Sequence, residues 1–91
     1  MINLNQLRAF FYVAKYKSYT ITAQKFFISQ PAVTAQIKLF ETFYDIKLFR
    51  KQGRSLFLTH IGKILFEKAE QIFHLEDEVD TILTQMKELN Q

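Results

Sequence analysis

The sequence predicts a mainly α-helical chain: a helix-turn-helix, a short two-stranded β wing and one long C-terminal helix. The 91 residues contain only two glycines and one proline, so few positions interrupt a helix. Apolar residues recur at helical spacing in four segments, and a glycine-containing basic stretch separates the third segment from the fourth. We therefore expect a winged helix-turn-helix domain in residues 1–58, with the helix-turn-helix at about 19–38 and the wing at about 48–58, and a linker helix in 59–91.

Composition and charge restrict the class of protein further. The chain has no cysteine, so disulfides and thiolate metal sites are excluded. No apolar run approaches the ~20 residues that span a bilayer, and no secretion signal is visible, so we expect a cytoplasmic protein that does not enter a membrane. Residues 1–58 carry a net charge of +7 and residues 59–91 a net charge of −4. This asymmetry indicates that the first part meets a polyanion.

The first two helices are predicted from caps and apolar spacing. Asn3 can cap a first helix that ends near 16–18, with Gln6 completing a capping box. Thr20 can cap a short second helix at about 21–27. The apolar positions of the first helix share one stripe: Leu4, Leu7, Phe10, Phe11 and Ala14.

The third helix, at about 30–43, has two different faces. Ser29 is a good N-cap, and Pro31 fits the first turn, where a missing N–H costs little. One face is apolar (Val33, Ile37, Phe40, Tyr44), and the opposite face is small and polar (Pro31, Thr34, Ala35, Lys38). A helix that enters a DNA major groove needs such a face at its N-terminal end. An ordinary amphipathic surface helix, or a generic helical hairpin, has the same pattern.

A β-hairpin is predicted next. Leu48-Phe49 and Leu56-Phe57-Leu58 are short apolar runs, and the stretch between them, Arg50 to Ser55, contains three cations and a glycine. A basic wing tip suits a phosphate backbone or a narrow minor groove. The alternative is a solvated loop that happens to be basic.

The last helix, capped by Thr59, is predicted over about 60–89. Its apolar residues follow steps of three and four, interrupted by Lys68, and form the seam Leu65, Ile72, Leu75, Val79, Ile82, Met86 and Leu89. Thirty residues would reach roughly 45 Å, too long to bury this face on a small domain. We therefore expect a homodimer through this helix, or contact with a further domain. The acids Glu76, Asp77, Glu78 and Asp80 are expected to form a solvated face.

Several motifs in register resemble one known family. They are Asn3 to Phe10, Ser18-Tyr19-Thr20 with Ala23, Ser29 to Thr34 with Gln36-Ile37 and Glu41, and Leu48-Phe49, Gly53-Arg54, Leu58-Thr59 and Gly62. Together they are similar to the N-terminal DNA-binding domain of LysR-type transcriptional regulators. Ala35 departs from the family, because many members carry a base-contacting Arg there. Thr22, Phe40, Tyr44-Asp45 and Lys51 are further departures.

The resemblance implies sequence-specific binding of double-stranded DNA by a dimer that reads an interrupted palindrome. It also implies tetramers in some full-length regulators, and a C-terminal domain, absent from this chain, that binds a small-molecule inducer. We therefore expect no cofactor in these residues. The expected base contacts are Gln30, Pro31, Ala32, Thr34 and Ala35. The expected backbone and wing contacts are Ser18, Thr20, Lys38, Arg50, Lys51 and Arg54.

Three other functions are less well supported by the sequence than DNA reading. An enzyme is poorly supported, because there is no glycine-rich phosphate loop and no acid–base cluster. His60 and His74 are about 21 Å apart along one helix, so they cannot share a metal ion. A protein-interaction module would not need the basic first part. A polyanion-binding patch without sequence preference is disfavoured only by the family resemblance.

Overall fold

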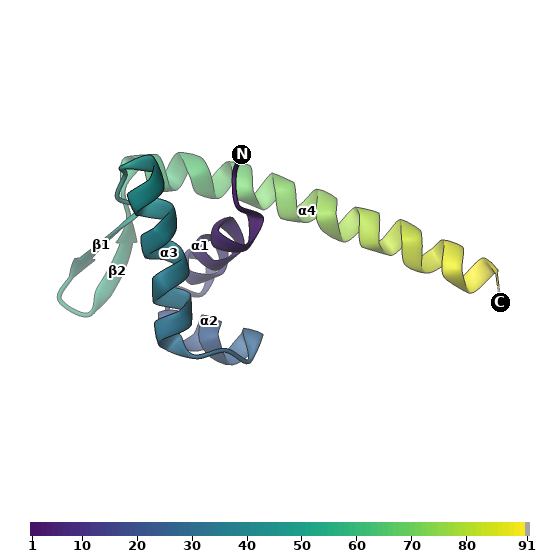
Figure 1. Ribbon diagram of the computed structural model, residues 1–91, viewed down its shortest axis with the longest axis horizontal. Coiled ribbons are helices and arrows are strands. Elements are labelled where there is room, and N and C mark those ends of the chain that lie inside the picture. The colour runs from purple at the N-terminus through teal and green to yellow at the C-terminus, as the bar shows by residue number, and fades with distance from the viewer. Residues whose placement is uncertain (91) are drawn as a thin grey trace.

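The structure, a computed structural model, describes residues 1–90 and confirms the predicted fold class. The elements are, in chain order, α1 (Leu4–Tyr16), α2 (Tyr19–Phe26), α3 (Gln30–Tyr44), β1 (Phe49–Gln52), β2 (Ser55–Leu58) and α4 (His60–Leu89). The two strands form one antiparallel hairpin. Figure 1 shows α4 as a long rod that extends away from the other elements, which accounts for the 53 Å length of the molecule against 25 and 21 Å across.

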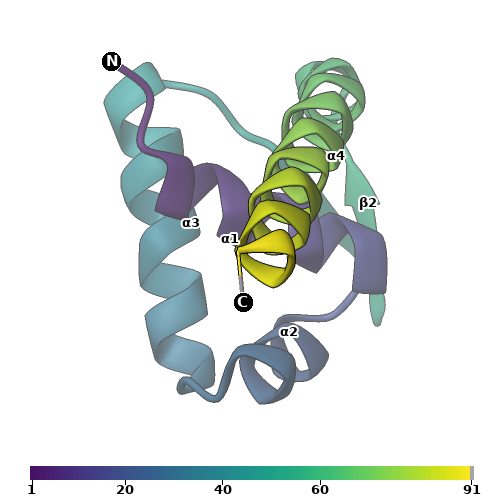
Figure 2. The ribbon, with the colours of Figure 1, turned by 90° about the vertical axis from the view of Figure 1, so that its right-hand side faces the viewer.

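Helix α1 lies at the centre of the winged domain. It contacts α2, α3 and α4, and Figure 2, viewed nearly along α4, shows it between α3 on one side and α4 with β2 on the other. Its buried residues are Leu7, Phe10, Phe11 and Val13. The rest of the core is Ala23, Val33, Ile37, Phe40, Leu48, Ala69 and Phe73. Six of these eleven residues belong to the apolar stripes predicted for α1 and α3, whereas Leu4 and Tyr44, predicted in the same stripes, are 47% and 42% exposed.

Side-chain caps start all four helices, but one predicted cap is wrong. Asn3, Ser29 and Thr59 cap α1, α3 and α4 as expected. Helix α2 begins at Tyr19, because the extended Ser18 accepts a 3.0 Å hydrogen bond from the amide of Ile21. Lys17 in the left-handed region ends α1, so the two helices follow almost directly, and Thr20 lies inside α2.

The wing is shorter at its tip than the sequence suggested. Strand pairing continues to Gln52 opposite Ser55, so the turn consists of Gly53 and Arg54 alone. Gly53 has φ of +60°, which a glycine adopts without steric cost. Arg50 and Lys51 were expected at the tip, but they lie within β1 because the ladder extends past them.

Helix α4 is anchored at its start and free at its end. The Thr59 hydroxyl donates to the Lys47 carbonyl at 2.6 Å and accepts from the Gly62 amide at 3.1 Å. Further along, Ala69 and Phe73 are buried against the domain, whereas every residue from 74 to 90 is exposed. Within residues 1–90, no helix is long and apolar enough to cross a membrane.

The acids Glu76, Asp77, Glu78 and Asp80 of α4 are exposed as predicted, but one of them has a partner that the sequence did not indicate. Glu76 was expected on a solvated face, but it forms a bidentate ion pair with Arg8 of α1, with both N–O distances 2.8 Å. The two residues are 68 positions apart, so no local pattern links them.

Gly62 yields a first prediction, because a Cβ there would collide with the backbone carbonyl of Leu48. Overpacking costs about 1–3 kcal/mol, and a backbone atom cannot rotate away as a side chain does. The gain in helix propensity from glycine to alanine is at most about 1 kcal/mol. We expect Gly62→Ala to lower the free energy of unfolding by about 1–2 kcal/mol in chemical denaturation. Glu67→Ala, an exposed change on the same helix, should stay within about 0.5 kcal/mol; an unchanged Gly62→Ala would contradict the prediction.

Candidate nucleic-acid interface

The N-terminal half of α3 presents a small polar face to solvent. Val33, Ile37 and Phe40 are at most 2% exposed, and they fix the rotation of the helix about its axis. Five of the predicted contact residues on this helix are exposed: Gln30, Pro31, Ala32, Ala35 and Lys38. Thr34 is only half-buried, so it offers less surface than its neighbours. The positive end of the helix dipole lies at the same terminus and favours a polyanion.

The turn before α3 and the loop after it hold the helix in place. At the turn, Phe27 adopts the left-handed region, and the amide of Ile28 donates to the carbonyl of Ala23 at 3.1 Å. At the other end, the Glu41 carboxylate accepts a 2.7 Å hydrogen bond from the amide of Leu48, just before the wing. Helix α3 and the wing are thereby connected by more than the intervening chain.

The two parts of this candidate interface, the N-terminal end of α3 and the hairpin, lie away from the free end of α4. In Figure 1, α4 starts at the top of the molecule and extends to the right, whereas the N-terminal end of α3 lies at the bottom, beside α2, and the hairpin projects downward at the left. The two acids of residues 1–58, Glu41 and Asp45, belong to the C-terminal end of α3 and its cap. No acidic side chain therefore interrupts the N-terminal half of α3.

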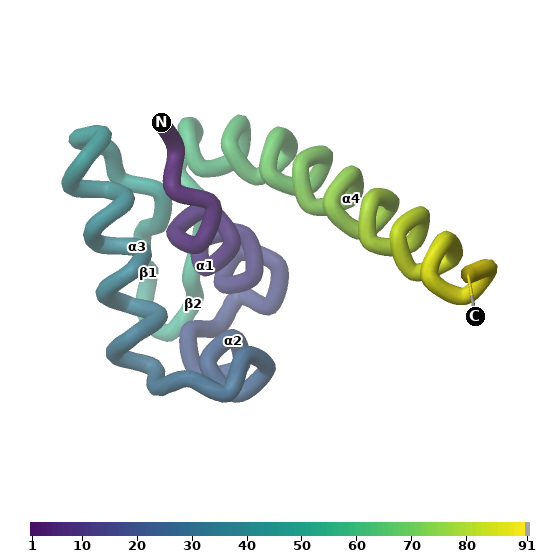
Figure 3. Tube along the Cα trace, turned by 45° about the vertical axis from the view of Figure 1, so that its right-hand side comes forward, coloured from purple at the N-terminus to yellow at the C-terminus, as the bar shows by residue number. Residues whose placement is uncertain are grey.

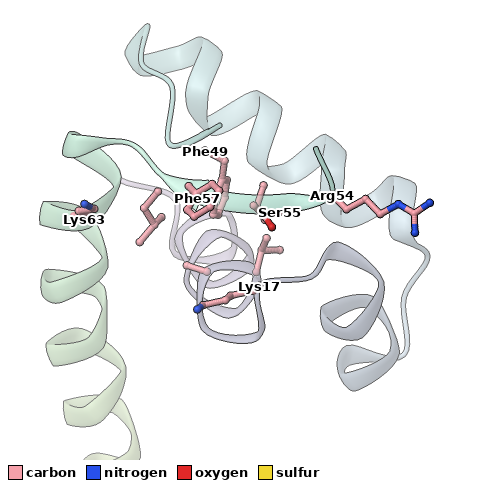
Figure 4. A pocket seen from close by; sticks show the side chains of 10 residues that line it. Lys17, Phe49, Arg54, Ser55, Phe57 and Lys63 are labelled. Atoms are coloured by element: carbon pink, nitrogen blue, oxygen red, sulfur yellow. The ribbon is translucent and has the colours of Figure 1, made fainter. Parts of the chain in front are cut away.

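The three cations of the wing, Arg50, Lys51 and Arg54, lie at different positions on the hairpin. Arg54 is exposed at the turn, and Figure 4 shows its guanidinium extending outward beyond the hairpin. Arg50 and Lys51 are successive residues of β1, so their side chains project from opposite faces. Lys51 shares a face with Phe49, which packs on the core, whereas Arg50 stands opposite the exposed Phe57. The three cations thus do not form one cluster.

The start of α2 adds a second group of candidates. Ser18 uses an oxygen lone pair to cap the helix, which leaves its hydroxyl proton free to donate to a phosphate. Thr20 is exposed in the same turn.

Sequence reasoning missed two cations near the wing, Lys17 and Lys63. Both line a groove of about 440 Å³ between α1, the hairpin and the start of α4, together with Arg54. Figure 4 shows Lys17 and Lys63 on either side of this groove. Lys17 directly precedes the cap Ser18, and this position is the one sequence signal that could have drawn attention to it.

A short helix-turn-helix with a small polar outer face, flanked by a hairpin with an exposed arginine, defines a winged helix-turn-helix DNA-binding protein. Comparison with known proteins agrees. The family model described as "Bacterial regulatory helix-turn-helix protein, lysR family" matches residues 4–63. The chain belongs to the LysR family of bacterial regulators.

Curated relatives share the family and are described as regulators of transcription. The chain is 44% identical over 70 residues to the glycine cleavage system transcriptional activator of Escherichia coli (strain K12), an alignment that covers 77% of this chain and 23% of that protein. It is 34% identical over 86 residues to the RuBisCO operon transcriptional regulator of Allochromatium vinosum, covering 94% of this chain and 28% of the relative. The chain therefore spans about a quarter of the length of these relatives.

Solved structures show the same architecture. The crystal structure of the BenM DNA-binding domain in complex with catB site 1 DNA has a TM-score of 0.83 and 26% identity, and it covers 93% of this chain and 96% of that one. Full-length CbnR complexed with its target DNA has a TM-score of 0.76 and 25% identity, with 91% and 29% coverage. Both matches are to LysR-type regulators in complex with DNA.

The position of Arg54 gives a prediction for the salt dependence of DNA binding. Each lost phosphate contact reduces the slope of log K against log salt by about 0.9, hence by about 1.8 for a symmetric dimer. Arg54→Ala should flatten the slope by this amount and weaken binding to specific and random duplexes alike, as measured by fluorescence anisotropy at several salt concentrations. Lys87→Ala removes the same charge at the far end of α4 and serves as the control. A slope equal to that of the unaltered chain would remove Arg54 from the interface.

Proposed function

We propose that this chain is the DNA-reading part of a LysR-type regulator that binds an interrupted palindrome as a homodimer. Helix α3 enters the major groove of each half-site, and the wing contacts the backbone or the adjacent minor groove. The observation that carries the proposal is the exposed small polar face at the start of a helix whose other face is locked in the core. Gln30 is the base-reading residue of choice, because its amide can pair with adenine.

Support for the dimer comes from the end of α4. Six residues of the predicted seam are between 39% and 78% exposed, although all six are apolar: Ile72, Leu75, Val79, Ile82, Met86 and Leu89. Burial of apolar area of this kind is the main driving force for association. The seventh residue, Leu65, is partly buried against the core, so it contributes to packing within the protomer as well.

The remaining properties follow from this function. A bacterial DNA-binding regulator acts in the cytoplasm, where the DNA is, and it needs no catalytic residues. The small-molecule inducer is expected to bind outside these residues, so the chain itself requires no cofactor. A tetramer of the full-length protein is compatible with a dimer held by α4.

The proposal is tested by selecting random duplex DNA with the purified chain and sequencing the bound fraction. We expect an interrupted palindrome to be enriched. Ile82→Glu puts a charge into the seam, so it should give a monomer in analytical ultracentrifugation and enrich single half-sites. Thr84→Glu adds the same charge on another side of the helix and should leave the dimer intact. Single half-sites enriched by the unaltered chain would contradict the dimer, and salt-sensitive binding without any enrichment would contradict sequence reading.

The same selection tests base reading by Gln30. Gln30→Ala should relax the preference at one base position per half-site, at a cost of about 1–3 kcal/mol for the preferred sequence. Gln71→Ala, an exposed glutamine change on α4, is the matched control. Equal losses on specific and random duplexes would mean that Gln30 contacts no base.

A further inference from the structure

Helix α4 acts as a lever because half of it has no support within the protomer. Phe66, Ala69 and Phe73 pack on the winged domain, and Figure 3 shows the helix continuing well beyond α1. At 1.5 Å per residue, the part after Glu76 extends about 20 Å. A tilt of about 10° would move its end by about 3.5 Å, which is close to one base-pair step of 3.4 Å. Small changes in the direction of α4 therefore matter for where a second protomer stands.

The last polar contact before this free part is the pair of Arg8 and Glu76. Two parallel N–O contacts of 2.8 Å join the guanidinium to the carboxylate, and the guanidinium carbon lies 4.7 Å from the centroid of the Phe73 ring. No hydrogen bond or ion pair connects residues 77–90 to the winged domain in the described part of the chain. The planar fork of arginine fixes direction as well as distance.

The Arg8–Glu76 pair is better suited to fixing the direction of α4 than to stabilising the fold. The side chains of Arg8 and Glu76 are 29% and 48% exposed, and an ion pair this accessible adds little to the stability of a fold. The hydrogen bond raises the pKa of Arg8 and lowers the pKa of Glu76, so both groups are charged at neutral pH. Burial of the Phe11, Phe66 and Phe73 rings is the larger stabilising contribution.

We propose that the Arg8–Glu76 pair, seated on Phe73, is a positioning device that sets the half-site spacing accepted by the dimer. It holds α4 in one direction relative to α1, and thereby fixes the separation of the two recognition helices. This inference rests on the proposed dimer, and it adds a determinant of specificity that contacts no DNA.

The test measures affinity for duplexes that carry two copies of the selected half-site, with spacers that differ by single base pairs across one helical turn. The unaltered chain should show one preferred spacing. Glu76→Gln keeps the side-chain shape but removes the charge, so duplexes one or two base pairs from the preferred spacing should gain by up to about fivefold relative to it. Arg8→Gln should broaden the profile in the same way. Glu78→Gln is the matched control, because Glu78 pairs only with His74 of its own helix in the described residues.

Binding to a duplex with a single half-site separates the possible results. Glu76→Gln should leave this affinity unchanged, because α3 and the wing remain in place. A uniform loss at every spacing, or a profile as narrow as that of the unaltered chain, would show that the pair has only a structural role and would overturn the inference. Absence of any preferred spacing in the unaltered chain would instead refute the proposed dimer on which the inference rests.

Discussion

Two adjacent phenylalanines on α1 hold the parts of this molecule together. Phe10 is fully buried and its ring lies 5.4 Å from that of Phe49, at the root of the wing. Phe11 stacks at 5.1 Å on Phe66 and lies 5.4 Å from Phe73, so it holds α4. Successive residues of a helix point about 100° apart, which allows one helix to contact two structures at once. The wing and the linker helix are therefore positioned from a single element, and removing either ring would loosen a different functional part.

The candidate DNA-binding face of α3 contributes almost nothing to the core. Its position therefore depends on the packing of the rest of the domain around α1. The apolar face of α3 is satisfied by α1 and α2, so the opposite face is free to be small and polar without loss of packing. The backbone is held instead by polar anchors at the edges, such as Glu41 on the amide of Leu48. Thr22, one of the departures from the family pattern, is 1% exposed, and its hydroxyl donates to the Ser18 carbonyl at 2.8 Å. A buried hydroxyl is tolerated there because it has a partner.

The sequence predicted those features that depend on neighbours along the chain. Helical spacing identified the stripes of α1 and α3, and the caps Asn3, Ser29 and Thr59 located three helix starts. The start of α2 was misplaced because Ser18 and Thr20 are both good caps, and the left-handed Lys17, which decides between them, leaves no mark in the residue pattern. The ion pair of the exposed Glu76 was missed because its partner Arg8 lies on another helix, and such a contact depends on how the helices cross. Contacts with DNA depend in the same way on how the protein and the duplex fit together, so a local sequence pattern does not determine them.

In the proposed recognition of DNA, helices α3 and α4 have different roles. In the proposed dimer, α3 reads bases, whereas the direction of α4 sets the distance between the two recognition helices. The two tasks meet at Thr59, whose hydroxyl bridges the Lys47 carbonyl before the wing and the Gly62 amide in the first turn of α4. Helix α4 is therefore connected to the root of the wing through Thr59 as well as to α1 through its apolar packing. In the proposed dimer, a change in the direction of α4 would thus alter the half-site spacing and the position of the wing together, while the exposed polar face of α3 stays the same.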